Sequence, residues 1–168
     1  LAAKGIPTPS GTVVSSHEDL SSIPLPNMIK AQIPIGGRQK AGGVLEARNQ
    51  KEAESIIKEM LFSTVRGFRV NRVLVEERLD IAREFYLGIT YDTVAKAPIA
   101  IFSAEGGVDI EELARQNPEK VQKRHFSVRS GLPEYKAREM VSLTGINGKT
   151  LLGLSNILSL LANIFLEN

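Results

Sequence analysis

The order of apolar and polar residues along the 168-residue chain predicts a mixture of helices and strands. Helices are predicted at residues 49–61, 108–119, 133–145 and 149–165, and a short one at residues 15–23. Strands are predicted at residues 27–33, 70–77, 84–92, 98–104 and 120–128. A short connection joins the runs 84–92 and 98–104, which predicts an antiparallel hairpin. Together with the interspersed helices, it indicates an α+β fold rather than a doubly wound parallel sheet.

The helix predicted at residues 49–61 has a clear start signal. Asn49 is followed three positions later by Glu52, which is the capping-box pattern. Apolar residues such as Ala53 and Ile57 fall on one face, so this helix is expected to pack on a sheet. The helix at 133–145 is expected to have Pro133 at its first helical position and to end on a glycine.

The last predicted helix, residues 149–165, is amphipathic. Its apolar stripe consists of Leu151, Leu154, Leu158, Leu161 and Phe165. The run is interrupted by Ser155, Asn156, Ser159 and Asn163. Because of these interruptions we expect no membrane-spanning segment.

Composition excludes several classes of function. The chain is 42% apolar and about one domain long, so it can bury a core. Basic and acidic residues nearly cancel, 21 against 19, and aromatic residues make up only 5%, so neither a nucleic-acid nor a membrane partner is expected. The absence of cysteine excludes disulfides and thiolate chemistry. His17 and His125 lack the spacing of metal ligands.

Positive charge is concentrated between residues 28 and 75. Its nine basic residues, against four glutamates, are Lys30, Arg38, Lys40, Arg48, Lys51, Lys58, Arg66, Arg69 and Arg72. Residues 36–43, GGRQKAGG, form a glycine-rich loop inside this segment. Its amides could converge on a phosphate, with charge added by Arg38 and Lys40. The loop matches neither G-x-x-x-x-G-K-[ST] nor G-x-G-x-x-G, so an ordinary hairpin loop is an equal alternative.

Two further groups of charged residues have both a functional and a structural explanation. Lys30 lies in an apolar strand, where an anionic ligand or an extended stem reaching solvent would satisfy its charge. The carboxylates of Glu76, Glu77, Asp80 and Glu84 could bind a ribose diol or an adenine amino group. They could equally form a solvated acidic connector.

Four segments taken together resemble the β subunits of succinate-CoA ligases, which are ATP-grasp enzymes. These segments are IKAQIPIGGRQKAGGV, VNRVLVEERLDIAREFYLGITYD, SAEGGVDIEELARQNPEK and PEYKARE. The resemblance extends over nearly the whole chain, and the family's loop sequence GGRGKAGGV and its EGGV segment are specific. It implies an ATP-grasp fold in which a nucleotide is held between two subdomains, here residues 16–77 and residues 1–15 with 78–168.

The resemblance also implies site residues. The expected nucleotide-binding residues are Lys30, Gly37, Arg38, Gln39, Glu76, Leu79 and Glu84. Lys30 matches a lysine that contacts phosphates, and Glu76 and Glu84 match positions near the adenine and the ribose. Gln39 stands where the family usually has glycine, and Leu79 where a polar residue is common.

The implied reaction is phosphoryl transfer between ATP or GTP, a carboxylate such as succinate, and a histidine of a partner α subunit, coupled to thioester formation with coenzyme A. The implied Mg²⁺ ligands and the coenzyme A site lie downstream of the position that matches Asn168. No catalytic or metal-binding residue is therefore expected within these 168 residues, which we expect to be inactive alone and truncated at both ends. The implied location is cytoplasmic, or the mitochondrial matrix in a eukaryote.

Other functions remain open from the sequence. One is another ATP-grasp ligase, such as a citryl-CoA, malyl-CoA or carboxylate–amine ligase. The other is a non-catalytic nucleotide-binding assembly module, which the substitution at Gln39 keeps in consideration.

Overall fold

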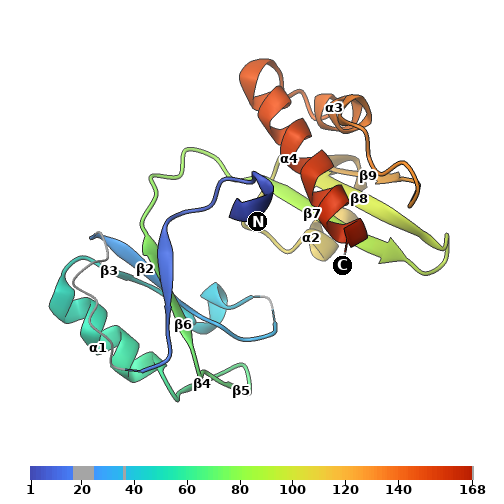
Figure 1. The fold of residues 1–168 in the computed structure, drawn as a ribbon. Coiled ribbons are helices and arrows are strands. Elements are labelled where there is room, and N and C mark those ends of the chain that lie inside the picture. Colours follow the sequence, from blue (N-terminus) through green and yellow to red (C-terminus); the bar gives the residue numbers. More distant parts are fainter. Residues whose placement is uncertain (17–24, 36, 168) are drawn as a thin grey trace. The chain divides into compact units, whose positions relative to one another are not determined.

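The computed structural model describes residues 1–16, 25–35 and 37–167, and the chain divides into two compact units (Figure 1). The smaller unit is Thr8–Asp80, and the larger comprises Leu1–Pro7 and Ile81–Asn168. Residues 8–15 belong to the smaller unit, although the sequence assigned them to the larger subdomain. The reason is that β1 (Gly11–Val14) pairs along its whole length with β6 (Val73–Glu77).

The smaller unit is built on a four-stranded antiparallel sheet of order β1-β6-β2-β3. Its other elements are β2 (Asn27–Ala31), the 3-10 helix η2 (Gln39–Ala41), β3 (Val44–Ala47), α1 (Gln50–Met60), β4 (Thr64–Val65) and β5 (Phe68–Arg69). The expected strands at 27–33 and 70–77 correspond to β2 and β6. The predicted helix at 15–23 lies mostly outside the described residues.

Helix α1 covers one face of this sheet. The side chain of Asn49 accepts a hydrogen bond from the Glu52 amide at 3.0 Å, which confirms the predicted cap. The Glu52 carboxylate bonds the amide of Arg48 rather than that of Asn49, so the reciprocal bond of the capping box is displaced by one residue. Ala53 and Ile57 are buried in a core shared with the strands, as predicted.

The opposite face of the same sheet is the one that α1 does not cover, and we refer to it as the open face. Ile29 and Ala31 of β2 are fully buried in the core with α1. Successive strand residues point to opposite faces, so Met28 and Lys30 project from the other face. This open face positions the candidate site.

The larger unit is built on a three-stranded antiparallel sheet of order β7-β8-β9. Its elements are η1 (Ala2–Lys4), β7 (Tyr86–Asp92), β8 (Ala97–Ser103), α2 (Ile110–Gln116), η3 (Pro118–Lys120), β9 (Val121–His125), α3 (Glu134–Ser142) and α4 (Gly148–Glu167). The predicted hairpin, the strand at 120–128 and all three helices are confirmed, except that α3 ends at Ser142 with Leu143 as its C-cap and not on a glycine. With its antiparallel sheets and packed helices the molecule has the predicted α+β fold.

Helix α4 differs from its predicted stripe. Leu154 and Leu158 are buried as expected, but so are Ser155 and Ala162, whereas Phe165 is 36% exposed. The burial of Ser155 is possible because its hydroxyl donates to the Leu151 carbonyl at 2.6 Å. The helix therefore packs through a face that includes two small residues.

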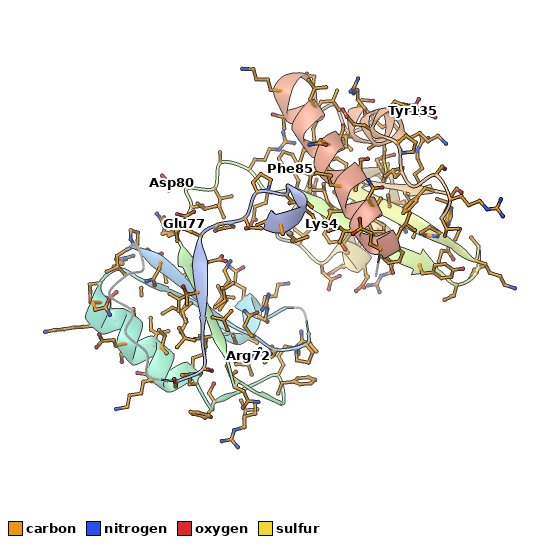
Figure 2. All side chains as sticks on the ribbon, in the orientation of Figure 1. Lys4, Arg72, Glu77, Asp80, Phe85 and Tyr135 are labelled. Atoms are coloured by element: carbon orange, nitrogen blue, oxygen red, sulfur yellow. The ribbon has the colours of Figure 1, made fainter. Side chains whose placement is uncertain are left out.

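Two other expectations about the helices need correction. By length and composition α4 could cross a membrane, so the expectation of no such run is wrong on those criteria. Mostly buried core helices of soluble proteins pass the same test, but only 22% of the tested window of α4 is buried; its buried residues join the core formed with β8 and α3. Pro133 is the N-cap of α3 and not its first helical residue; its extended ψ of 147° places it outside the helix. Tyr135, in the first turn, is exposed (Figure 2).

Candidate nucleotide-binding site

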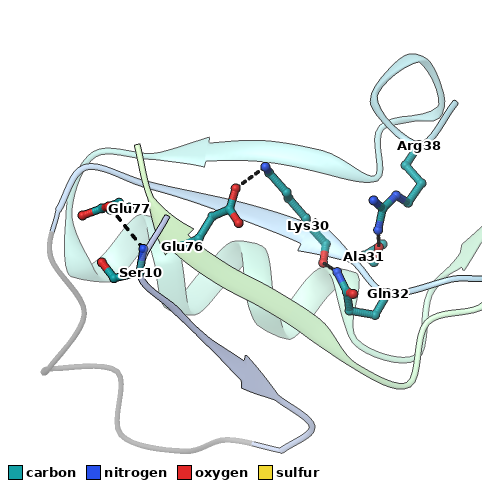
Figure 3. A network of polar contacts seen from close by, with 7 residues as sticks. All are labelled: Ser10, Lys30, Ala31, Gln32, Arg38, Glu76 and Glu77. Carbon is teal, nitrogen blue, oxygen red and sulfur yellow. Dashed lines mark hydrogen bonds and ion pairs between the residues drawn. The ribbon is translucent and has the colours of Figure 1, made fainter. Parts of the chain in front are cut away.

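The open face of the smaller unit's sheet carries an ion pair between Lys30 and Glu76. The two residues come from neighbouring strands, β2 and β6, and the Lys30 ammonium contacts Glu76 Oε1 (Figure 3). The Lys30 side chain is 31% exposed and that of Glu76 is 11% exposed. Two residues assigned separately from the sequence are thus direct partners, and Lys30 already has a counter-charge in the chain.

A glycine on β1 leaves the space that the Glu76 side chain occupies. A Cβ added to Gly11 would lie 2.8 Å from Glu76 Cβ and 2.8 Å from the Val75 carbonyl oxygen. A side chain at this position would therefore collide with the residue that holds Lys30. The ion pair therefore depends on the missing side chain at Gly11 of β1, which makes room for Glu76, as well as on the attraction between its two charges.

The glycine-rich loop connects β2 to β3 directly beside this pair. Its base is closed by a bond from the Ala31 amide to the Gly43 carbonyl, 2.8 Å, and by one from the Gly43 amide to the Arg38 carbonyl, 2.8 Å. The Arg38 guanidinium donates to the Ala31 carbonyl at 2.8 Å (Figure 3). One of its five N–H donors is therefore used inside the loop, and the residue following Lys30 is tied to the loop's own arginine.

Gly37 and Gln39 differ in what they require of the backbone. Gly37 has a φ of 69°, in the left-handed region that favours glycine. Gln39 is the first residue of η2, is exposed, and is not among the described non-glycine residues with positive φ. Glutamine therefore fits this loop without strain where the related family has glycine.

Leu79 and Glu84 belong to other segments of the chain than this pair. Leu79 is 50% exposed in the segment after β6 and has no polar side chain to offer a ligand. Glu84 belongs to the larger unit, where the amide of Gly106 donates to its carbonyl at 3.2 Å. Among the expected site residues, the smaller unit thus joins Lys30 to Glu76 and ties the loop residues to the end of β2.

Two glycines of the EGG segment form a cradle for Glu84. A Cβ on Gly106 would lie 2.6 Å from both the Glu84 carbonyl carbon and the Phe85 nitrogen. One on Gly107, which has a φ of 67°, would collide with the Glu84 carboxylate. Phe85 packs on the buried Phe102 with ring centroids 6.4 Å apart, which anchors the backbone next to Glu84. Sequence reasoning missed this role, although the adjacent glycines were a visible signal.

Polar pairs elsewhere in the larger unit have structural explanations. Hydrogen bonds from the amide of Ala95, from the His125 ring at 2.8 Å and from the amide of Val94 lower the pKa of Asp92. The Glu105 carboxylate, 2.7 Å from the Lys120 ammonium, raises the pKa of that lysine. Among residues 1–16, 25–35 and 37–167, no group of three or more His, Asp or Glu side chains could hold a metal ion.

Comparison with known proteins identifies relatives of the chain. The chain is 42% identical over 165 residues to the succinate–CoA ligase [ADP-forming] subunit beta of Methanocaldococcus jannaschii, which covers 97% of this chain and 45% of that protein. It is 40% identical over 152 residues to the GDP-forming subunit beta of Thermus thermophilus, covering 88% of this chain and 40% of that protein. The chain thus spans less than half the length of these curated relatives.

Solved structures share the fold. A dinucleotide-forming acetyl-coenzyme A synthetase of Ca. Korarchaeum cryptofilum, in complex with coenzyme A, Ca-AMPCP and HgCl⁺, superposes with a TM-score of 0.74 at 23% identity, over 99% of this chain and 76% of that one. ATP citrate lyase from Methanothrix soehngenii gives a TM-score of 0.52 at 22% identity, over 80% of this chain and 35% of that one. The model of the ATP-grasp domain matches residues 1–168, so the chain belongs to the ATP-grasp family.

Proposed function

We propose that the chain is the nucleotide-binding part of the β subunit of an NDP-forming acid-CoA ligase. The reaction is succinate + CoA + ATP or GTP to succinyl-CoA + NDP + phosphate, passing through a phosphohistidine of an α subunit. The observation that carries the proposal is the Lys30–Glu76 pair on an open sheet face beside a basic glycine loop. The identity to subunits named for both the ADP-forming and the GDP-forming reaction supports it, and leaves either nucleotide as substrate.

The chemistry of the smaller unit suits a phosphorylated ligand. Phosphoryl transfer depends mainly on positioning and on neutralising the charge of the transferring group. The Lys30 ammonium belongs to β2, in the residue directly before Ala31. The Arg38 guanidinium belongs to the loop that follows β2, and it donates to the Ala31 carbonyl. Glu76 fixes the ammonium and presents a second carboxylate oxygen to a hydroxyl or amino donor. We assign phosphate binding to the side chains of Lys30 and Arg38 and to the backbone amides of Gly37 and Gln39, and contacts with the nucleoside to Glu76.

Two assignments rest mainly on the family resemblance. Glu84 is proposed as the larger unit's contribution to nucleotide binding, held by Gly106 and Gly107. Leu79, exposed and apolar, would contribute through its backbone alone. The α subunit, coenzyme A and the carboxylate are assigned to the complete assembly, and no step is assigned to a metal within these residues.

The choice of organic acid is the open part of this proposal. The shared fold with an acetyl-coenzyme A synthetase and an ATP citrate lyase keeps a citryl-CoA or malyl-CoA ligase as the alternative. A coupled assay of the complete protein with its α partner, supplied in turn with succinate, malate, citrate and acetate, would decide it. Turnover with succinate at least tenfold faster than with the others is the expected result.

The nucleotide site is tested by separating the charge of Lys30 from its structural effect. Lys30→Met alone leaves the Glu76 carboxylate, 11% exposed, without its partner, so we expect it to cost about 1–3 kcal/mol of unfolding free energy. Lys30→Met combined with Glu76→Gln removes both charges and should recover most of that stability. Because a charge-assisted phosphate contact is lost in both variants, ATP affinity should fall about tenfold in each.

Arg48→Gln is the matched control. Arg48 belongs to the same unit and carries the same charge, but its side chain is 79% exposed and its partner is Glu46 at 3.5 Å. Its removal should leave ATP affinity within about twofold, as measured by calorimetry on the complete protein. Wild-type affinity in the double variant, once stability has been restored, would contradict the proposed site.

A further inference from the structure

The β4–β5 hairpin has an unusual residue at its tip. Thr64 pairs with Arg69 and Val65 with Phe68, so the turn consists of Arg66 and Gly67 alone. Both have positive φ, 50° for Arg66 and 82° for Gly67. Two-residue turns with positive φ at both positions strongly favour asparagine or glycine at the first of them. An arginine there is held in a conformation that its side chain disfavours, and such outliers cluster at functional positions.

The side chain of Arg66 lies against the glycine-rich loop. A Cβ added to Gly37 would be 2.6 Å from Arg66 Nη1, so the absence of a side chain at Gly37 makes room for the guanidinium. Val65, next to it in the hairpin, is buried, and its Cγ1 would lie 3.2 Å from a Cβ on Gly43. The hairpin is therefore seated on two glycines of the loop, one near each end.

Two backbone hydrogen bonds fix the base of the hairpin. The Phe62 amide donates to the Val70 carbonyl at 2.7 Å, and the Val70 amide donates to the Ser63 carbonyl at 2.9 Å. Arg69 stacks on the Phe62 ring, 5.5 Å from its centroid. The two arginines of the hairpin thus have different environments: one packs on an aromatic ring and the other contacts the glycine loop.

The segments of sequence that form the loop and the hairpin carry charge of one sign. Residues 31–44 and 61–73, which form the loop, the hairpin and the approach to β6, contain no Asp or Glu. Their basic residues are Arg38, Lys40, Arg66, Arg69 and Arg72. Arg72 directly precedes β6, and its carbonyl accepts a bond from the Gln32 amide at 3.0 Å, so it lies where the loop begins (Figure 2). A guanidinium in such a setting suits the bidentate binding of phosphate oxygens.

We propose that Arg66 is a phosphate-binding residue, supplied by the β4–β5 hairpin to the glycine-rich loop and directed at the β- and γ-phosphates of a nucleoside triphosphate. The inference rests on the proposed nucleotide site and adds a ligand from a different element. It explains why arginine occupies a turn position that asparagine would fill with less strain. It also explains why Gly37, beside that guanidinium, has no side chain.

The test uses the opposite signs expected for stability and binding. Arg66→Asn suits the turn better than arginine, so the unfolding midpoint in urea should stay level or rise. ATP affinity, measured by calorimetry on the complete protein, should nevertheless fall about tenfold because a charge-assisted contact is lost. AMP lacks the β- and γ-phosphates, so its affinity should change by less than about twofold. Inorganic phosphate, titrated separately, should show no binding that Arg66→Asn alters.

Arg69→Gln is the matched control, because it removes the same charge from the same hairpin. If Arg66 binds the phosphates by direct contact, and the overall positive charge of the hairpin does not account for binding, Arg69→Gln should leave ATP affinity within about twofold. Unchanged ATP affinity in Arg66→Asn, or an equal loss in Arg69→Gln, would overturn the assignment of Arg66 while leaving the nucleotide site intact. A loss equally large for AMP or for inorganic phosphate would also overturn it. Wild-type protein that binds no nucleotide would overturn the proposed function together with this inference.

Discussion

The two units hold their carboxylates in different ways. In the smaller unit, Glu76 is fixed by a charge, the Lys30 ammonium, across two strands of an open sheet face. In the larger unit, Glu84 is fixed by packing, because Gly106 and Gly107 let the backbone approach it. A charge pair can be changed and rebalanced by a second substitution. A backbone contact cannot, so the two units should respond very differently to mutation.

The largest effect is expected from Gly106→Ala in the larger unit. The added methyl would lie 2.6 Å from the Glu84 carbonyl carbon and the Phe85 nitrogen, which are backbone atoms that cannot rotate away. Overpacking of this kind costs about 1–3 kcal/mol, measured as unfolding free energy in urea. Gly153→Ala is the control, since Gly153 lies exposed in α4 with nothing within 4 Å of an added Cβ. That change should stabilise by about 0.5–1 kcal/mol. Equal changes in unfolding free energy for Gly106→Ala and Gly153→Ala would show that close packing at Gly106 does not hold Glu84, and would contradict the comparison between the two units.

A smaller effect is expected from Gln39→Gly in the smaller unit's loop. Gln39 is exposed at the start of η2 and has no positive φ to relieve, so glycine brings no conformational gain there. We expect the free energy of unfolding to fall by at most about 0.5–1 kcal/mol and ATP affinity to stay within about twofold of wild type. Loss of ATP binding would show that the glutamine side chain contacts the ligand, and would favour a specialised pocket.

The smallest effect is expected at the exposed turn between β7 and β8. The amides of Ala95 and Val94 and the His125 ring lower the pKa of Asp92 below its ordinary value of 3.8. The folded state therefore favours the ionised carboxylate, so this stabilisation is present above about pH 4 and is lost as the pH falls through the folded-state pKa. Asp92→Asn should be slightly less stable than wild type in urea at about pH 6, and the difference should shrink at about pH 3. A stability difference between wild type and Asp92→Asn that grows as the pH falls would contradict the lowered pKa of Asp92.

Local patterns were enough to predict most of the elements. The helices α1 to α4 and the strands β2 and β6 to β9 follow from residue spacing and end signals, as does the Asn49 cap. The α+β class and the ATP-grasp resemblance follow from the same residues, and both are confirmed. These features depend on interactions within a few residues, or on motifs that can be read as a string.

The strands that were missed are short, and β1 among them depends on a partner distant in sequence. β1 and β3 have four residues each, and β4 and β5 have two each. Segments so short have no periodicity of their own, so pairing alone makes them strands. β1 is set by β6, some sixty residues later, and this pairing is also what moved residues 8–15 into the smaller unit.

The site shows the same division. The sequence identified Lys30, Glu76, the glycine loop and Glu84 as separate candidates, but contained no sign that Lys30 and Glu76 are partners. Nor did it show that Arg66 reaches Gly37, or that Gly106 supports Glu84. Residue type and local order determine which groups can bind a phosphate. Which of these groups meet depends on strand register and on where a missing Cβ allows two segments to approach, and both arise only when distant parts of the chain pack together.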